Sequence, residues 1–146
     1  MKTFEELIQN HQKTTKKDLN KFFESLEPVN QHELTGFWQG SYFPTGSKME
    51  VFLKNFVILR WVGKIFLPEN KVKALIFSFL GAQFNIPCFG KSTLKKTLYR
   101  NKQSASINYQ NLPIIDYLRK IDDEYVMGIM EMNEKVEVYF YLKKYE

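Results

Sequence analysis

The 146-residue chain contains a single cysteine, Cys88, so it cannot form an internal disulfide. The cysteine content gives no reason to expect an oxidising compartment, and we expect a cytoplasmic protein. The N-terminus carries two glutamates where a secretory signal peptide needs an apolar run. The longest stretch without charge, 74–90, is short and is broken by Gly81 and Pro87, so we expect no membrane span.

The sequence also lacks the short motifs of common catalytic and cofactor sites. It has no Gly-X-Ser-X-Gly nucleophile motif, no glycine-rich phosphate loop and no Cys/His metal spacing. Cys88 has no histidine or second cysteine beside it that would activate it as a nucleophile. We therefore expect neither a metal nor a cofactor.

Acidic residues are absent between Glu69 and Asp116, and the net charge of +5 is concentrated there. The basic segment 91–102 is expected to be a solvated strand and turn, or else a surface for peripheral contact with an anionic membrane. Its basic residues are Lys91, Lys95, Lys96, Arg100 and Lys102. No aromatic-basic RNA-recognition motif accompanies it, so we expect no nucleic acid partner.

Aromatic residues, in contrast, make up 16% of the chain, which favours sheets and lined cavities. The N-terminal residues 1–30 are expected to form a helical segment. Thr3 and Glu6 have capping-box spacing, and a second helix start follows at Thr15. Pro28 is expected to end this second helix. Its apolar stripe recurs at intervals of three and four residues and consists of Leu19, Phe22, Phe23 and Leu26.

Residues 31–146 form the second expected unit, a β-rich domain. Its eight strand-length runs are the stretch around Trp38, 61–67, 71–79, 93–100, 104–110, 114–121, 124–132 and 135–144. A helix is expected at about 48–59, because Ser47 and Glu50 form a further capping box. Eight short strands favour a closed antiparallel β-barrel of the calycin or lipocalin kind, since closure removes exposed sheet edges. An open α+β antiparallel sheet is the alternative.

Three motifs in order along the chain carry a family resemblance. They are GFWQG with the following YFPTG (36–46), WVGKIF (61–66) and NYQNLPIIDYLRKIDDEYVMGIME (108–131). Together they resemble the GXWXG family and the domain of unknown function that usually follows it, and this resemblance implies no established reaction. The segment 81–102 matches no family pattern, and Leu118 replaces a fairly constant phenylalanine.

A weaker similarity, through the Gly-X-Trp of the first strand, is to lipocalins and fatty-acid-binding barrels. Haem-binding nitrobindin-like barrels also carry Gly-X-Trp-X-Gly, but they use a histidine as the iron ligand. The two histidines of this chain, His11 and His32, precede the first strand, so haem is not expected.

Trp38 lies between Gly36 and Gly40, which are expected on its own face of the strand because side chains alternate. The two glycines would leave room for the indole to lie flat and for another segment to cross close by. We expect a core tryptophan that closes one end of the barrel; the alternative is a residue that stacks on a ligand. By similarity to lipocalins, Arg119 is expected to pack on the Trp38 ring.

Asp116 follows two isoleucines, so its strand is expected to bury a carboxylate, which is costly unless the carboxylate is paired. It is either a structural acceptor or a site residue, as an acid–base catalyst or a contact for a polar ligand group. Lys64 is the possible opposite charge. Inside the barrel it would pair or bind an acidic head group, but a solvent-facing lysine is the expected state.

The aromatic surplus and the lack of a catalytic motif favour binding of a small hydrophobic or amphipathic molecule inside the barrel, such as a fatty acid, an isoprenoid or an aromatic metabolite. The expected ligand-binding residues are Trp38, Trp61, Lys64, Phe66, Tyr109, Asp116 and Arg119, with Tyr117 as a further polar contact. One alternative is an isomerase or hydrolase of a hydrophobic substrate, with Asp116 as its acid or base. Another is an interaction protein that uses the basic segment 91–102.

Overall fold

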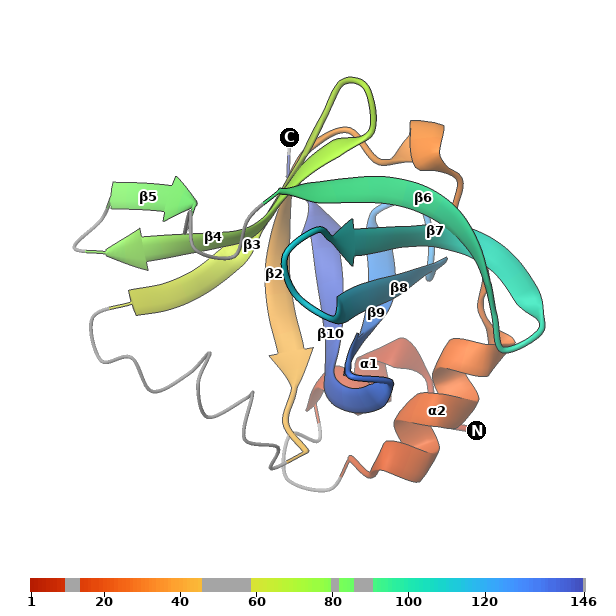
Figure 1. Cartoon of the computed structure of the whole chain (residues 1–146). Coiled ribbons are helices and arrows are strands. Elements are labelled where there is room, and N and C mark those ends of the chain that lie inside the picture. Colours follow the sequence, from red (N-terminus) through yellow and green to blue (C-terminus); the bar gives the residue numbers. More distant parts are fainter. Residues whose placement is uncertain (10–13, 46–58, 80–81, 86–90, 146) are drawn as a thin grey trace.

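One antiparallel sheet that closes on itself dominates the computed structural model, which describes residues 1–9, 14–45, 59–79, 82–85 and 91–145 (Figure 1). The strands are β1 (Glu27–Pro28), β2 (Gly36–Phe43), β3 (Leu59–Leu67), β4 (Lys71–Phe79), β5 (Ala82–Asn85), β6 (Ser92–Tyr99), β7 (Lys102–Tyr109), β8 (Ile114–Lys120), β9 (Tyr125–Met132) and β10 (Lys135–Lys144).

Eight of the described strands form the ring, in the order β2-β3-β4-β6-β7-β8-β9-β10, and β10 pairs with β2 to close it. The seam between β4 and β6 is short, with Lys71 opposite Thr93 and Val72 opposite Ser92. The predicted closed barrel of eight antiparallel strands is confirmed, and the open-sheet alternative is wrong. Two short strands were not predicted: β1 pairs with β8, and β5 pairs with β4.

Short turns connect three hairpins: two residues long between β6 and β7 and between β9 and β10, and three residues long between β3 and β4. In each turn two adjacent residues have positive φ, which in the two-residue turns is the conformation whose twist matches the twist of the flanking strands. These pairs are Glu69-Asn70 between β3 and β4, Arg100-Asn101 between β6 and β7, and Asn133-Glu134 between β9 and β10. Each pair contains an asparagine, which tolerates this region better than most residues.

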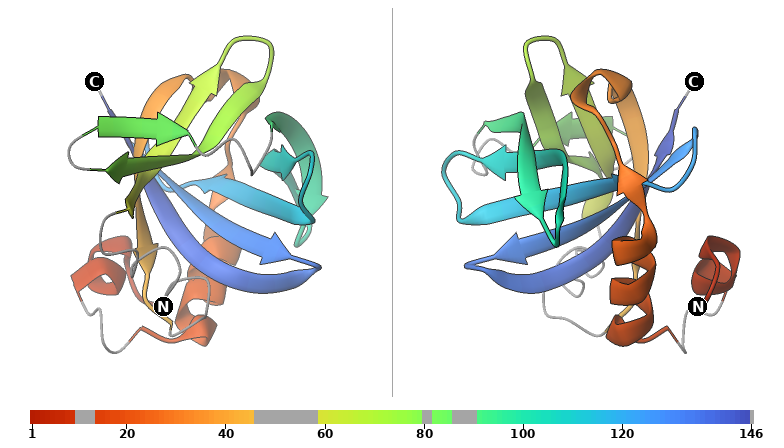
Figure 2. Two further views of the ribbon diagram at one scale, coloured as in Figure 1. Left: turned by 60° about the vertical axis from the view of Figure 1, so that its left-hand side comes forward. Right: turned by 90° about the vertical axis from the view of Figure 1, so that its right-hand side faces the viewer.

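Two α-helices, α1 (Phe4–Gln9) and α2 (Lys16–Ser25), lie outside the barrel beside β9 and β10 (Figure 2). Both predicted helix starts are confirmed. The backbone N–H of Glu6 donates to the Thr3 hydroxyl at 3.2 Å, and that of Asp18 donates to the Thr15 hydroxyl at 3.1 Å. A short 3₁₀-helix, η1 (Gln31–Glu33), precedes β2. The helix expected at about 48–59 falls almost entirely on residues outside the described ranges, and β3 begins at Leu59.

The barrel wall separates two hydrophobic cores, because successive side chains of a strand point to opposite faces. On β9, Val126 and Met130 point into the barrel, while Met127 and Ile129 pack outside against the helices. Both faces of β9 are therefore buried, which explains why its sequence is an almost unbroken apolar run. The helices seal one outer side of the barrel.

Close packing across the strands requires glycine at two positions. A Cβ at Gly63 would lie 2.1 Å from the backbone oxygen of Trp38, and the φ of Gly63 is +155°. A Cβ at Gly128 would lie 2.1 Å from the ring of Phe140. At Gly36, in contrast, a Cβ would meet nothing within 4 Å. The expectation that Gly36 makes room for a crossing segment is therefore wrong, and its φ of +75° is the feature that favours glycine.

Within the part of the chain that the structure describes, no helix combines the length and apolar character needed to cross a membrane.

Candidate functional site

Three polar side chains meet inside the barrel, among mostly apolar neighbours. The Lys64 ammonium on β3 lies 2.9 Å from Oδ2 of Asp116 on β8, and the Tyr109 hydroxyl on β7 donates to the same oxygen at 3.0 Å. Lys64 also donates to the backbone oxygen of Ala74 at 3.1 Å and to the Tyr109 hydroxyl at 3.4 Å. We refer to Lys64, Tyr109 and Asp116 as the polar trio.

All three members of the polar trio are buried: Lys64 is 2% exposed, Asp116 0% and Tyr109 7%. The expectation that Lys64 faces solvent is therefore wrong, and the alternative, an internal pair with Asp116, is what the structure has. A buried ion pair of this kind adds little net stability, because desolvating both charges offsets most of their attraction. Stability alone therefore does not account for its presence.

The second carboxylate oxygen of Asp116, Oδ1, is buried and has no hydrogen-bond partner among the described residues. Leaving a buried polar atom unpaired costs about 1–3 kcal/mol, and more when the group is charged. Native structures contain few such atoms, and each one calls for an explanation. Oδ1 is the one unsatisfied acceptor that the trio presents to the interior.

The Tyr109 hydroxyl is held in its protonated form. Burial, reinforced by the neighbouring Asp116 charge, raises the pKa of the phenol well above its ordinary value. Tyr109 therefore acts as a neutral donor to Asp116, and the trio as a whole carries one positive and one negative charge. Its net charge is zero.

Aromatic and aliphatic side chains surround the trio. The Lys64 ammonium lies 5.0 Å from the ring centre of Phe140, and in the strand register Lys64 is opposite Trp38. Asp116 is opposite Met130 on β9 and Ile107 on β7. These neighbours are themselves buried, so the polar trio has a buried, mostly apolar setting in which electrostatic contacts are strong.

Trp38 and Phe66 both point into the barrel and pack edge to face, with ring centres 6.4 Å apart. The Trp38 indole is 3% exposed, and its N–H donates to the backbone oxygen of Thr35 at 3.2 Å. It also borders a surface hollow of about 410 Å³ lined in part by Lys120 and Lys144. Trp38 thus separates the core from this hollow. The side chain of Trp61 lies outside the described residues, and only its backbone is placed, in β3.

Arg119 points out of the barrel, away from the face that carries Asp116, so the predicted packing on Trp38 is wrong. Its guanidinium lies 4.5 Å from the ring centre of Phe23 in α2. It donates to three backbone oxygens: Phe23 at 3.0 Å, Tyr99 at 2.7 Å and Arg100 at 3.0 Å. Burial, together with the nearby Arg100 charge, lowers the pKa of the guanidinium, although it stays charged. Arg119 ties α2 to the β6–β7 hairpin.

Tyr117 also points outward. Its ring stacks on Tyr99 with centres 3.7 Å apart and planes 4° from parallel. The tyrosine expected as a second polar contact inside the barrel is therefore on the wrong face, and Tyr109 alone of the two lines the interior.

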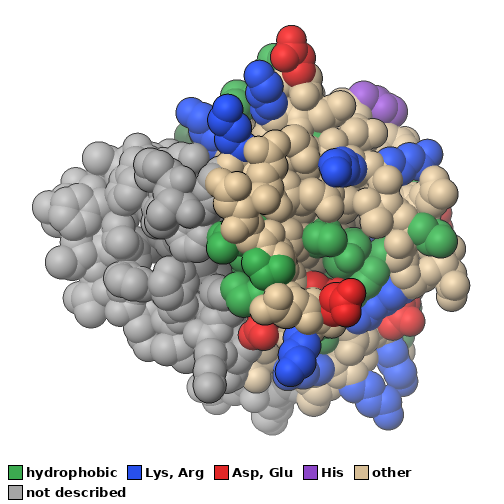
Figure 3. Space-filling view, viewed as in Figure 1, with side chains coloured by type: hydrophobic (Ala, Val, Ile, Leu, Met, Phe, Trp, Pro, Cys, Tyr) green, Lys and Arg blue, Asp and Glu red, His purple; other side chains and the backbone are tan. Residues whose placement is uncertain are grey.

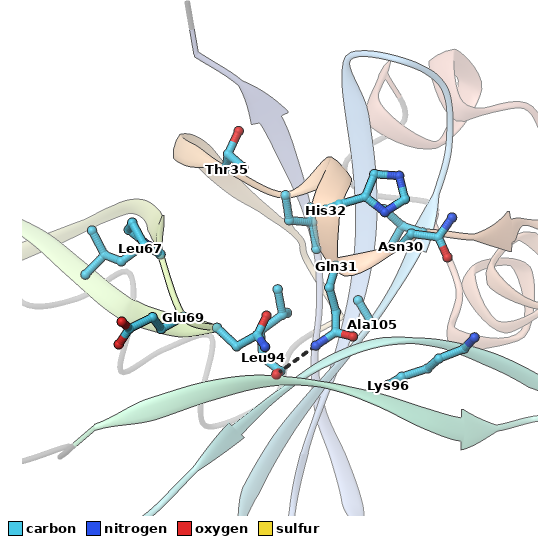
Figure 4. A pocket seen from close by; sticks show the side chains of 13 residues that line it. Asn30, Gln31, His32, Thr35, Leu67, Glu69, Leu94, Lys96 and Ala105 are labelled. Atoms are coloured by element: carbon cyan, nitrogen blue, oxygen red, sulfur yellow. Dashed lines mark hydrogen bonds between the residues drawn. The ribbon is translucent and has the colours of Figure 1, made fainter.

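Two further hollows border the barrel. One of about 460 Å³ lies between η1 and the β3–β4 turn; Figure 4 shows it, with Gln31 donating to the backbone oxygen of Leu94. Its floor includes the core residues Leu34 and Ala105. The other, about 660 Å³, lies at the β7–β8 loop and is lined in part by Tyr109 and Ile114. This second hollow reaches the edge of the polar trio.

The basic residues of the segment 91–102 point in different directions. The Arg100 guanidinium donates to the Asn20 side chain at 2.8 Å, and Lys102 donates to the backbone oxygen of Leu26 at 2.8 Å, so both contact the helical region. The exposed members are Lys91, Lys95 and Lys96. On the face seen in Figure 3, some Lys and Arg side chains gather at the upper left, below an acidic one, and others are scattered among acidic and uncharged side chains. Contact with an anionic membrane stays a prediction.

No group of three His, Cys, Asp or Glu side chains within the described ranges is arranged to hold a metal ion.

The fold and the site together define a small closed barrel of eight antiparallel strands with a buried lysine–aspartate–tyrosine cluster inside. Residues 21–79 match the family described as GXWXG protein, and residues 90–144 match the domain of unknown function DUF4334. This confirms the resemblance seen in the sequence. No curated protein matches the chain.

A crystal structure of a protein from Thermomonospora curvata is similar, with a TM-score of 0.86. The two chains are 24% identical, and the match covers 97% of this chain and 95% of that one. At this identity the likeness concerns the fold alone.

Proposed function

We propose that this protein binds a small hydrophobic or amphipathic molecule inside the barrel, with the polar trio as the contact for the polar end of that molecule. The observation that supports the proposal most directly is Oδ1 of Asp116, a buried charged acceptor without a partner among the described residues. An interior filled only for stability would be expected to satisfy that atom or to replace it by an apolar group.

The surroundings of the trio support the same proposal. Ligand sites are mostly apolar and contain a few polar groups that fix orientation. Here the walls include Trp38, Phe66 and Phe140, and three of the buried polar side chains form one cluster. A calycin-like container in the cytoplasm is the form of the proposal that the sequence favours.

The first test is native mass spectrometry of the protein purified from cells, followed by titration with the neutral fluorescent probe N-phenyl-1-naphthylamine. We expect either a co-purified molecule of a few hundred daltons, about the size of drug-like ligands, or saturable binding of the probe. Protein that carries no adduct and leaves the probe fluorescence unchanged would contradict the proposal.

A matched pair of variants locates the binding. Ala74→Leu adds bulk to the inner face next to the backbone oxygen that Lys64 contacts, and it should weaken probe binding. Leu98→Ala changes a side chain that is 65% exposed and should leave binding unchanged. If Ala74→Leu and Leu98→Ala change the affinity for the probe equally, the probe binds outside the barrel.

A catalytic role for Asp116 is the second candidate, and the same free oxygen favours it. Lys64 and Tyr109 hold Oδ2, which leaves Oδ1 as the atom able to take a proton from a hydrophobic substrate. The two candidates differ in what happens to a bound molecule. A container returns it unchanged after long incubation, whereas an isomerase or hydrolase converts it, and Asp116→Asn abolishes the conversion.

A further inference from the structure

In the polar trio the hydrogen-bond donors face acceptors, whereas one acceptor oxygen has no donor among the described residues. This difference specifies the kind of ligand head group that fits beside the trio. An ammonium has three hydrogens, and those of Lys64 face three acceptors: Asp116 Oδ2, the backbone oxygen of Ala74 and the Tyr109 hydroxyl. The single hydrogen of the Tyr109 hydroxyl is used by Asp116. The trio therefore has no donor left to offer.

The capacity that remains is that of an acceptor. Oδ1 of Asp116 can accept hydrogen bonds and receives none from the described residues, while Oδ2 receives two. A ligand that meets the trio must therefore bring a hydrogen, as an O–H or N–H group does. A ligand that brings only acceptors, such as an ether or ester, leaves Oδ1 unpaired and buried.

Charge restricts the choice further. The trio is already neutral, with Lys64 paired to Asp116 at 2.9 Å. A ligand carboxylate would place a second negative charge next to Asp116, and like charges at such distances disfavour each other's ionised forms. A ligand ammonium would add a net positive charge to a buried, mostly apolar interior, which is costly. A neutral hydroxyl avoids both penalties.

We infer that the barrel selects an apolar molecule with a neutral hydroxyl head, an alcohol or a phenol, which donates to Oδ1 of Asp116, and that it discriminates against the corresponding carboxylate. This inference rests on the proposed function and deepens it. Of the hollows around the barrel, the one of about 660 Å³ at the β7–β8 loop borders the trio, at Tyr109.

The test compares four ligands with similar apolar chains: 1-decanol, methyl nonyl ether, decanoate and decylammonium. Their affinities for the purified full-length protein are measured by displacement of N-phenyl-1-naphthylamine. Because a hydrogen bond to a charged group contributes about 1.5–3 kcal/mol, decanol should bind about 10- to 100-fold more tightly than the ether. It should also bind more tightly than decanoate and decylammonium.

The variants Asp116→Asn and Tyr109→Phe link this preference to Oδ1. Asp116→Asn removes the charged acceptor, so the preference for decanol over the ether should shrink to about two- to tenfold, the range of a neutral hydrogen bond. Tyr109→Phe leaves Oδ1 in place, so the preference should persist. If Asp116→Asn does not fold, the wild-type comparison and Tyr109→Phe still decide the matter.

Three results would overturn the inference and leave the proposed function standing: an ether that binds as tightly as the alcohol, as when Oδ1 is satisfied by water alone; a carboxylate that binds as tightly; or an ammonium that binds more tightly. Absence of binding by all four ligands and by the fluorescent probe would instead contradict the proposed function itself. The two failures are therefore distinguishable in one set of titrations.

Discussion

The ammonium of Lys64 and the carboxylate of Asp116 meet across the full width of the barrel. Between β3 and β8 lie β4, β6 and β7 on one side of the ring and β2, β10 and β9 on the other, so the two strands are diametrically opposed. The 2.9 Å contact between them is an ion pair that links opposite walls of the barrel. The protein thus places its most costly buried charges at the centre of its core.

Removing one partner of the Lys64–Asp116 ion pair should reduce the stability of the fold far more than removing both partners. Lys64→Met leaves Asp116 as an unpaired buried charge, and we expect a loss of about 3–5 kcal/mol in the free energy of unfolding. The double variant Lys64→Met/Asp116→Leu leaves no charge and should be at least about 1 kcal/mol more stable than Lys64→Met. Urea denaturation followed by circular dichroism measures both. Additive losses would contradict the pairing.

Stability should fall in alkali through Tyr109. The pKa of its phenol is raised in the folded protein, so the stability it contributes is fully present below the unfolded value near 10 and is lost as the pH rises above that value. Tyr109→Phe should therefore show a shallower decline in the free energy of unfolding between about pH 9 and pH 11. Parallel declines in the two proteins would show that Tyr109 ionises freely in the native barrel.

Arg119 should resist even conservative replacement. A lysine has a single ammonium in place of a planar fork and cannot reach the oxygens of Phe23, Tyr99 and Arg100 together. We expect Arg119→Lys to cost about 2–4 kcal/mol, as the loss of one or two hydrogen bonds from a charged donor. In Arg119→Lys, amide hydrogen exchange should increase in α2 before it increases in the barrel strands.

The neighbouring Lys120 provides the control for Arg119. Lys120 forms partly exposed ion pairs with Glu33 at 2.8 Å and Asp123 at 3.4 Å. Such surface pairs contribute about 0–1 kcal/mol, so Lys120→Met should have a small effect. If the two variants lose equal stability, the three carbonyl contacts of Arg119 are not what secures α2.

Gly128→Ala should be severely destabilising, and a second substitution, at Phe140, should restore part of the lost stability. The added methyl would lie 2.1 Å from the ring of Phe140, and overpacking of this kind costs about 1–3 kcal/mol or more. Phe140→Leu in the same chain removes the ring and should restore part of the loss. Thermal unfolding of the single and double variants measures the coupling, and additive effects would contradict the contact.

The local rules predicted most of the barrel. Apolar runs separated by turn residues located all eight barrel strands within a few residues, because turn chemistry and alternation act locally. The missed strands β1 and β5 are two and four residues long, and their pairing depends on partners distant in sequence. Closure of the ring by the contact of β10 with β2 was predicted from the number of short strands, since closure removes exposed sheet edges.

The site was predicted in part, and the wrong predictions for Arg119 and Lys64 each have a physical reason. Asp116 and Arg119 are three residues apart on one strand, so their side chains must point to opposite faces. Placing Asp116 inside should have placed Arg119 outside, where it meets Phe23. For Lys64 the sequence left the face open, because a strand lysine next to glycine carries no local sign of burial. The carbonyl of Ala74 as its acceptor is invisible to side-chain patterns.

The two family matches divide the barrel, since residues 21–79 contain β2, β3 and β4, and residues 90–144 contain β6 to β10. Neither part can close a ring alone, and each part holds one member of the central ion pair, Lys64 in the first and Asp116 in the second. The interior is therefore an interface between two halves that happen to share one chain. The two halves of the sequence therefore meet at this ion pair, inside the closed ring.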